Sequence, residues 1–182
     1  MYHRVTAHAV GGTNPTWNVT PGRFRRQIEG LLKRGYQAWQ LNRAVEYRKA
    51  GEPIPPHVFV VTFDDGYECV YREAWPILQE LSVPATVFAV TSYFDAETPF
   101  SADDWALAGS KSVPESTWRP LSTRQCEEML EQGLVEIGSH THTHADFTGR
   151  PAAFREDLHT SFQTLFEKFN IDISYYPDMN IT

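Results

Sequence analysis

Two short polar clusters carry side chains that can bind a metal ion and move a proton. Asp64 and Asp65 directly follow the apolar run His57 to Phe63, and Gly66 comes after them. The second cluster, residues 139–144 (Ser-His-Thr-His-Thr-His), contains three of the seven His in the chain. Two imidazoles and one carboxylate leave open positions on a zinc ion, which is the arrangement of catalytic and not structural sites. Water held in such a site ionises near neutral pH.

Each cluster alone has a simpler explanation. An Asp-Asp-Gly sequence usually forms a turn, and a His-x-His-x-His sequence is often a surface loop or an adventitious metal site. Their shared context favours a functional site, because both follow apolar strands at the end where α/β folds build active sites. Adjacent side chains on an extended chain point to opposite sides, so one carboxylate can bind a metal while the other accepts a proton.

The elements that position these clusters alternate between strands and helices, which predicts an α/β fold. Apolar and β-branched runs predict strands at Met1–Val5, Gln37–Leu41, His57–Phe63, Thr86–Val90, Leu134–Ile137 and Ile171–Tyr176. An open doubly wound sheet and an incomplete or distorted barrel both fit this order. In either architecture, ligands gather at the C-terminal ends of the strands.

Caps and apolar stripes predict the helices between these strands. Thr20 caps a helix that starts at Pro21 and closes at Gly35. The predicted apolar stripe of this helix is Phe24, Ile28, Leu31 and Leu32. The predicted stripe of the last helix, which starts at Pro151, is Phe154, Leu158, Phe162 and Leu165.

Three further helices are predicted from local signals. Asn42 caps one that runs to about Lys49, and Pro76 bends or shortens another that runs to about Leu81. Ser122-Thr-Arg-Gln125 is a capping box for a helix to about Glu131. Two non-periodic stretches remain, a Gly- and Pro-rich loop at Gly11–Asn18 and a long excursion at Thr91–Trp118, which is typical of a substrate-facing loop.

Composition bounds the class of protein. The chain has 182 residues, 41% of them hydrophobic, which is long enough for one compact core and excludes a disordered protein. The net charge of -7 and the lack of a long Lys/Arg run disfavour nucleic acid as a partner. Cys69 and Cys126 form no metal or redox motif, so we expect buried, reduced thiols. We find no signal-peptide pattern and no apolar stretch that could span a membrane.

Three segments resemble the polysaccharide deacetylase family, which has the NodB homology domain (carbohydrate esterase family 4). Thr62-Phe-Asp-Asp-Gly66 looks like the first motif of the family, His140-Thr-His-Thr-His144 looks like the second, and Met1-Tyr-His-Arg-Val5 resembles its opening strand. The resemblance runs from the first residue to about Gly149 and continues through the last helix. It implies a distorted (β/α) barrel and one deacetylase-like domain over residues 1–182.

The resemblance also implies roles for individual residues. Asp64 becomes the general base, and Asp65, His140 and His144 become ligands of zinc or a similar divalent ion, while His142 has no assigned role. The implied reaction removes N-acetyl groups from a carbohydrate polymer or oligomer, and O-acetyl esters could react by the same steps. Family analogy also implies an extracytoplasmic location. The oligomeric state is left open.

Further residues could contact a sugar. Tyr67 follows the Asp-Asp-Gly turn, and Trp105 and Trp118 in the long excursion either stack on sugar rings or anchor the loop by burial. His3 either lines the pocket at the end of the first strand or is a core His bonded to a carbonyl. His159 is expected to be a partly exposed helical residue and not the general acid.

The chain departs from the family in its later motifs. The Arg-x-Pro-aromatic motif, the Asp/Trp motif and the late Leu-x-His that supplies the general acid are not intact. Ser174-Tyr-Tyr-Pro-Asp178 lies where the Pro-aromatic motif is expected, but it lacks the Arg, and the chain ends at Thr182. One alternative is therefore a deacetylase-like protein that binds metal but turns over poorly. Another is a non-haem iron oxygenase with a two-His, one-carboxylate triad, which the α/β pattern and the second carboxylate disfavour.

Overall fold

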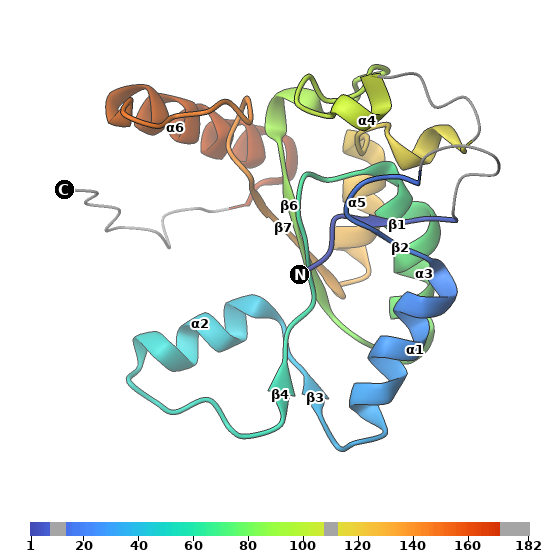
Figure 1. The fold of residues 1–182 in the computed structure, drawn as a ribbon. Coiled ribbons are helices and arrows are strands. Elements are labelled where there is room, and N and C mark those ends of the chain that lie inside the picture. The colour runs from blue at the N-terminus through green and yellow to red at the C-terminus, as the bar shows by residue number, and fades with distance from the viewer. Residues whose placement is uncertain (8–13, 108–112, 172–182) are drawn as a thin grey trace.

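A computed structural model describes residues 1–7, 14–107 and 113–171 of the chain (Figure 1). Three parallel strands lie at the centre of the fold, in the order β5 (Thr62–Phe63), β6 (Ala85–Ala89) and β7 (Val135–Ser139). Thr86 of β6 lies opposite Thr62 on one side and Glu136 on the other. Because all three strands are parallel, their C-terminal ends meet at one edge of the sheet.

Two smaller parallel sheets extend this wall. β1 (Arg4–Val5) pairs with β2 (Asn18–Val19), and β3 (Gln37–Ala38) pairs with β4 (Val58–Phe59). The segment before β1 joins the central sheet, because Tyr2 forms a β-bridge with Phe63. The Tyr2 N–H donates to the Thr62 carbonyl (2.8 Å), and the Asp64 N–H donates to the Tyr2 carbonyl (2.9 Å). Within the described part of the chain the strands do not close into a full ring. The prediction of an α/β fold with an incomplete or distorted barrel is confirmed.

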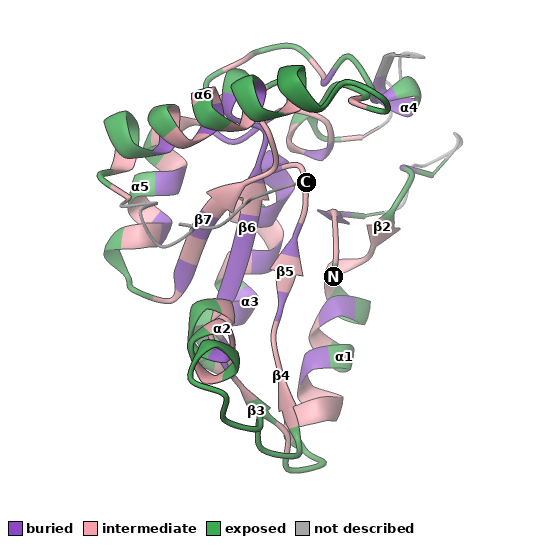
Figure 2. Cartoon of the chain, turned by 90° about the vertical axis from the view of Figure 1, so that its left-hand side faces the viewer, coloured by how far each residue is buried: buried purple, intermediate pink, exposed green. Residues whose placement is uncertain are grey.

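The helices cover the wall of strands. They are α1 (Pro21–Leu32), α2 (Leu41–Lys49), α3 (Trp75–Leu81), α4 (Asp104–Leu107), α5 (Thr123–Glu131) and α6 (Pro151–Phe169). Figures 1 and 2 show α1, α3 and α5 against the central strands, whereas α6 crosses the end where β6 and β7 finish. Figure 2 shows that buried residues concentrate along the central strands and on the helix faces turned toward them.

Local sequence signals account for the starts of three helices. The Thr20 side chain accepts a hydrogen bond from the Arg23 N–H and caps α1, in which Phe24 and Ile28 are buried. The capping box predicted at Ser122 is present in full at the start of α5. Pro76 lies in the first turn of α3, after a π-helical turn at residues 70–74, so the α-helix is shortened at this proline, as predicted.

Several predicted elements differ from the structure. The run His57–Phe63 is not one strand but two, β4 and β5, because its first half pairs with β3 and its second half pairs with β6. Asn42 does not cap α2. Gln40 occupies that position, and the backbone N–H of Asn42 lies inside the helix and donates to Glu136 (3.4 Å). The predicted loop Gly11–Asn18 ends in β2, which the sequence did not predict.

Other predictions fall partly outside the described residues. Residues 8–13 of the predicted loop, 108–112 of the long excursion, and 172–182 are not described, so the strand predicted at Ile171–Tyr176 and the motif Ser174–Asp178 are not tested. Cys69 and Cys126 are buried and free, as predicted, and burial raises the pKa of the Cys126 thiol to about 12. Among the described residues, every helix is too short or too polar to cross a bilayer.

Candidate metal centre and cleft

Asp65 is presented by a tight turn at the end of β5. Both Asp65 (φ 71°) and Gly66 (φ 84°) have left-handed backbone conformations. A Cβ added to Gly66 would lie 3.0 Å from the Cβ of Ala89, so only glycine fits against β6 at this position. The carbonyl of Asp65 accepts a hydrogen bond of 3.2 Å from the Val90 N–H. The carboxylate is therefore fixed to the ends of two neighbouring strands.

The imidazoles come from the loop that follows β7. The backbone N–H of His140 donates to the carbonyl of Ala89 (2.9 Å) and so continues the pairing between β6 and β7. Thr141 and His144 have positive φ angles of 69° and 57°, which curl the loop back on itself. The rings of His140 and His144 lie beside each other, with centroids 5.1 Å apart.

The two predicted clusters converge. Oδ1 of Asp65 lies 3.3 Å from Nε2 of His140 and 3.5 Å from Nε2 of His144. One ligand atom from each of the three residues lies within 4.8 Å of the others. Ligands at about 2.0–2.1 Å from a tetrahedral zinc ion would be separated by about 3.4 Å. The donor set and its spacing therefore fit a divalent ion of that size.

The electrostatics of this cluster also suit a cation. Burial alone would raise the pKa of Asp65, but the hydrogen bond from His140 and the charges of His3, His140 and His144 lower it overall. The hydrogen bond to Asp65 raises the pKa of His140, burial opposes this effect, and the charges of Asp65 and Asp64 add to it. Asp65 is thus stabilised as an anion by positive charge, which a metal ion would supply in place of the His protons.

Asp64 lies beside the three converging residues without joining them. Its backbone N–H donates to the Tyr2 carbonyl (2.9 Å), and its side chain is half-buried. Its charge reaches His140. The adjacent carboxylates therefore differ in position, because of the two only Asp65 belongs to the group of converging side chains.

Two polar residues of α6, Asp157 and Ser161, form hydrogen bonds with the loop that carries His140 and His144. The carboxylate of Asp157 accepts hydrogen bonds from the His142 N–H (2.6 Å), the Thr143 N–H (3.1 Å) and the Thr143 hydroxyl. The hydroxyl of Ser161 lies 2.7 Å from that of Ser139 and donates to the Thr141 carbonyl (3.2 Å). Asp157 is 9% exposed and Ser161 is fully buried.

The apolar stripe predicted for this helix is only partly buried, because Phe154, Leu158 and Phe162 are half-buried and Leu165 alone of the four is buried. The buried residues of α6 are Asp157, Ser161 and Leu165. These three positions are spaced i, i+4 and i+8, so they share one face of the helix. The sequence signal for this buried face was the helical spacing of Asp157 and Ser161 with Leu165. A search for apolar residues alone does not detect it.

His142 contacts a neighbouring loop and is not one of the three converging residues. Its Nδ1 lies 3.0 Å from the hydroxyl of Thr91, at the start of the long excursion. The Thr91 N–H donates to the Thr141 carbonyl and the Ser92 N–H donates to the His142 carbonyl. The loop that carries the two ligands is therefore bound on one side by α6 and on the other by residues 91–92.

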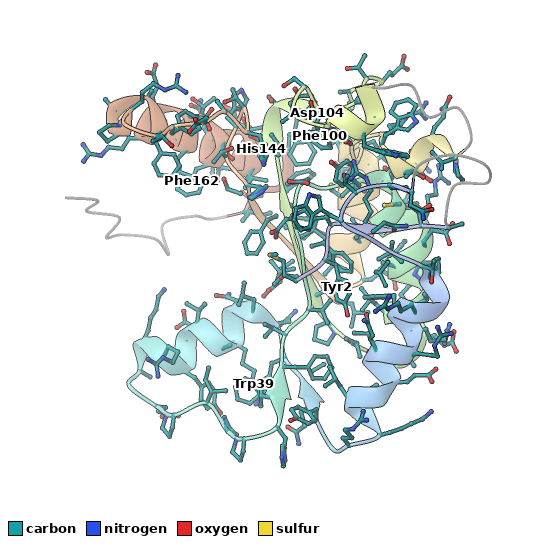
Figure 3. All side chains as sticks on the ribbon, in the orientation of Figure 1. Tyr2, Trp39, Phe100, Asp104, His144 and Phe162 are labelled. Carbon is teal, nitrogen blue, oxygen red and sulfur yellow. The ribbon has the colours of Figure 1, made fainter. Side chains whose placement is uncertain are left out.

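A cleft of about 300 Å³ opens next to the ligands. It is lined by Asp65, His140 and His144 together with His3, Tyr67 and Trp105, which are the three candidate substrate-binding residues. Figure 3 places Phe100 and Asp104, which also line the cleft, at the same end of the molecule as His144, whereas Trp39 lies at the other end.

The candidate residues differ in how much surface they offer. Tyr67 is 4% exposed and Trp105 is 8% exposed, so a ligand could reach only a small area of either ring. Trp118 is half-buried beside the Arg119 guanidinium and His159 is exposed on α6, and neither is among the described residues that line the cleft.

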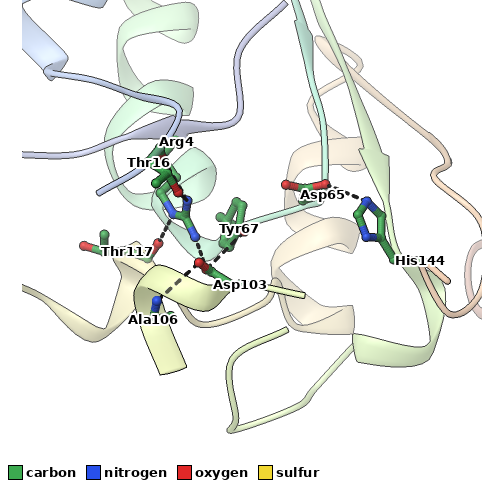
Figure 4. A network of polar contacts seen from close by, with 8 residues as sticks. All are labelled: Arg4, Thr16, Asp65, Tyr67, Asp103, Ala106, Thr117 and His144. Atoms are coloured by element: carbon green, nitrogen blue, oxygen red, sulfur yellow. Dashed lines mark hydrogen bonds and ion pairs between the residues drawn. The ribbon is translucent and has the colours of Figure 1, made fainter. Parts of the chain in front are cut away.

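A buried ion pair supports the wall opposite the ligands (Figure 4). The Arg4 guanidinium pairs with Asp103 and donates to the carbonyls of Thr117 and Thr16 (2.9 Å each). Its central carbon lies 3.9 Å from the centre of the Tyr67 ring, and the Tyr67 hydroxyl donates to Asp103 (3.2 Å). This network ties β1 to the long excursion.

Sequence comparison agrees with this arrangement. The profile of the polysaccharide deacetylase family matches residues 51–176, which include both clusters. The chain therefore belongs to the polysaccharide deacetylase family.

Two curated relatives are similar over a stretch of comparable length. A poly-beta-1,6-N-acetyl-D-glucosamine N-deacetylase of Escherichia coli K12 is 35% identical over 127 residues, which are 68% of this chain and 18% of the relative. An enzyme of the same name from Staphylococcus epidermidis is 29% identical over 139 residues, which are 76% of this chain and 42% of the relative. The chain thus spans less than half the length of these relatives.

Solved structures share the fold. IcaB from Ammonifex degensii superposes with a TM-score of 0.72 at 24% identity, over 94% of this chain and 68% of that one. The Streptococcus pyogenes deacetylase PplD, solved in complex with acetate, gives a TM-score of 0.71 at 22% identity, over 93% and 67% of the two chains. These likenesses support the incomplete barrel described above.

Proposed function

We propose that this chain is a metal-dependent deacetylase that removes acetyl groups from an N-acetylated carbohydrate polymer or oligomer, and that residues 1–182 form one deacetylase-like domain. The observation that carries the proposal is the convergence of Asp65, His140 and His144 on one wall of a cleft. Zinc is the ion that the donor set favours. When bound, it would lower the pKa of water and polarise the acetyl carbonyl.

The remaining steps fall to side chains of the chain itself. We assign Asp64 as the general base, because it lies beside the ligands without converging on them and can accept a proton from the attacking water. Addition of water to the acetamide carbon is followed by cleavage of the C–N bond, which yields acetate and a free amine. The amine gains a proton as it leaves, and this balances the proton that Asp64 takes from the attacking water. Among the described residues, His3 is the imidazole that lines the cleft outside the ligand group, so we place it at the substrate.

The relatives suggest the substrate class. The names of the Escherichia coli and Staphylococcus epidermidis relatives specify poly-beta-1,6-N-acetyl-D-glucosamine. We extend this class to the present chain as part of the proposal, with O-acetyl esters as a second type of bond open to the same steps. Such a polymer fits a protein that works outside the cytoplasm, and we include that location in the proposal.

Acetate release tests the activity. Purified protein is incubated with β-1,6-linked N-acetylglucosamine oligomers, with and without a chelator, and zinc is then restored. We expect release that the chelator abolishes and zinc recovers. Protein that binds zinc but releases no acetate from β-1,6-linked, β-1,4-linked or O-acetylated oligomers would identify the deacetylase-like metal-binding alternative and reject the proposed activity.

A matched pair of variants tests the base. Asp64→Asn removes the proton acceptor and keeps the shape, so we expect the rate to fall by about 10²–10⁴-fold with the zinc content unchanged. His159→Gln changes an exposed residue outside the cleft lining and serves as the control. Full activity in Asp64→Asn would remove that residue from the mechanism.

A further inference from the structure

Trp17 is a large aromatic side chain that the fold leaves in solvent at the edge of the cleft. Its side chain is 77% exposed, although it lines the same cleft as the three candidate ligands. One face stacks on the His3 imidazole, with ring centroids 5.7 Å apart and an interplanar angle of 26°. A single exposed apolar side chain is common on protein surfaces, but this one borders the cleft that holds the candidate ligands.

The backbone around Trp17 is held from both sides. The Arg4 N–H donates to the Trp17 carbonyl (3.2 Å), and the buried Arg4 guanidinium donates to the Thr16 carbonyl (2.9 Å). The Asn18 side chain exchanges two hydrogen bonds with the backbone of Thr6, at 3.0 and 3.1 Å. The indole is therefore presented from an anchored segment.

The conformation of Trp17 is also strained. Its φ angle is 52°, in the left-handed region that a bulky residue rarely adopts. Strain of this kind persists where surrounding contacts enforce it, and it concentrates at ligand-binding positions. Here the contacts of Arg4 and Asn18 enforce it.

Other aromatic rings of the cleft do not offer a comparable face. Tyr67 and Phe100 are each 4% exposed, and Trp105 is 8% exposed. Among the described residues that line the cleft, Trp17 therefore presents the largest accessible aromatic surface. Aromatic faces of this kind bind the apolar C–H face of a sugar ring, because that face is flat and carries few polar groups.

We propose that Trp17 is a stacking platform for a pyranose ring of the substrate, and that this ring is the neighbour of the unit that loses its acetyl group. The proposal rests on the proposed function. The assignment to the neighbouring ring follows from position, since Trp17 lines the same cleft as the three converging residues without being one of them, and its stacking contact is with His3. The enzyme would then prefer oligomers to the single sugar.

Steady-state kinetics with oligomers of increasing length test this platform. Trp17→Ala should raise KM for the tetramer by about 5- to 10-fold, and the loss in kcat/KM should be larger for the tetramer than for the monomer. Trp17→Phe keeps an aromatic face and should recover most of the loss. Phe166→Ala removes another exposed aromatic, on α6 and outside the cleft lining, and serves as the control for general surface effects.

Binding to the metal-free protein separates this inference from the proposed activity. Titration of a β-1,6-linked N-acetylglucosamine tetramer into metal-free protein, followed by NMR or calorimetry, should show weaker binding to Trp17→Ala than to wild type. If wild type binds the tetramer through Trp17 but releases no acetate, the activity is wrong and the platform stands. If wild type is active and Trp17→Ala matches it in tetramer KM and binding, the platform is rejected.

Discussion

The carboxylate of Asp157 accepts a hydrogen bond of 2.6 Å from the backbone N–H of His142. In the sequence, His142 lies between the two candidate metal-binding residues His140 and His144. The same carboxylate accepts two more hydrogen bonds from Thr143. Helix α6, which contributes no residue to the cleft lining, thus fixes the loop that carries His140 and His144. Groups that orient metal ligands in this way commonly affect metal affinity nearly as much as the ligands themselves.

We therefore predict that Asp157→Asn weakens zinc binding. The amide keeps the size of the side chain but replaces one acceptor oxygen with a donor, so one of the three N–H or O–H groups of the loop loses its partner. We expect zinc affinity to fall by about 10- to 100-fold, as measured by competition with a coloured chelator. Glu156→Gln, the exposed neighbour on the same helix, is the control. Equal affinities in the two variants would show that Asp157 does not position the ligands.

The candidate site was largely predictable because its residues follow strands directly. Parallel strands bring their C-terminal ends to one edge, so the turn after β5 and the loop after β7 had to approach each other. Asp157 and Ser161 were missed because the search for a buried helix face counted apolar residues. Trp17 was missed because its segment was predicted as a loop, and an exposed tryptophan leaves no periodic signal.

The fold was predictable where local chemistry decides the structure. The caps of α1 and α5 and the shortening of α3 at Pro76 depend on side chains close in sequence, and all three were predicted. The split between β4 and β5 was not, because an apolar run does not say which neighbour each half pairs with. Asn42 is a good capping residue, but the start of α2 is set by tertiary contacts, including that of its N–H with Glu136.

Zinc should stabilise the folded chain. A ligand at a concentration about 100 times its dissociation constant adds about 2.7 kcal/mol to the free energy of unfolding. For a domain of this size we expect the thermal midpoint to rise by about 5–10 °C on addition of zinc. His140→Ala should lose this rise, whereas His159→Ala should keep it because its side chain is exposed on α6. The same rise in both variants would place the zinc elsewhere.

Asp95 should contribute stability that depends on pH. Partial burial would raise its pKa, but hydrogen bonds from the side chain and backbone of Thr123, with the charge of Lys168, lower it overall. Because the folded pKa lies below the unfolded value of about 3.9, the stabilisation is complete above that value and is lost as the pH falls through the folded pKa.

Urea unfolding of Asp95→Asn tests this linkage. At pH 6 the variant should be less stable than wild type by about 1 kcal/mol or less, since the carboxylate is half exposed. The difference should shrink as the pH is lowered below 4. Glu97→Gln, an exposed acid on the same segment, should show no such trend. A difference that is constant with pH would mean that the charge of Asp95 is not involved.

The Arg4–Asp103 pair should be a large single contributor to the stability of the cleft wall. The two side chains are 1% and 3% exposed, so removal of one charge leaves the other buried without its counter-ion. We expect Asp103→Asn to lower the free energy of unfolding by about 3–5 kcal/mol in urea titrations, whereas Asp104→Asn, an exposed neighbour, should change it little.

Arg4→Met combined with Asp103→Leu should recover part of the loss, because an apolar pair removes both charges. Recovery would be incomplete, since the carbonyls of Thr16 and Thr117 lose their donors. If Asp103→Asn and Asp104→Asn destabilise the protein equally, the pair does not anchor the wall.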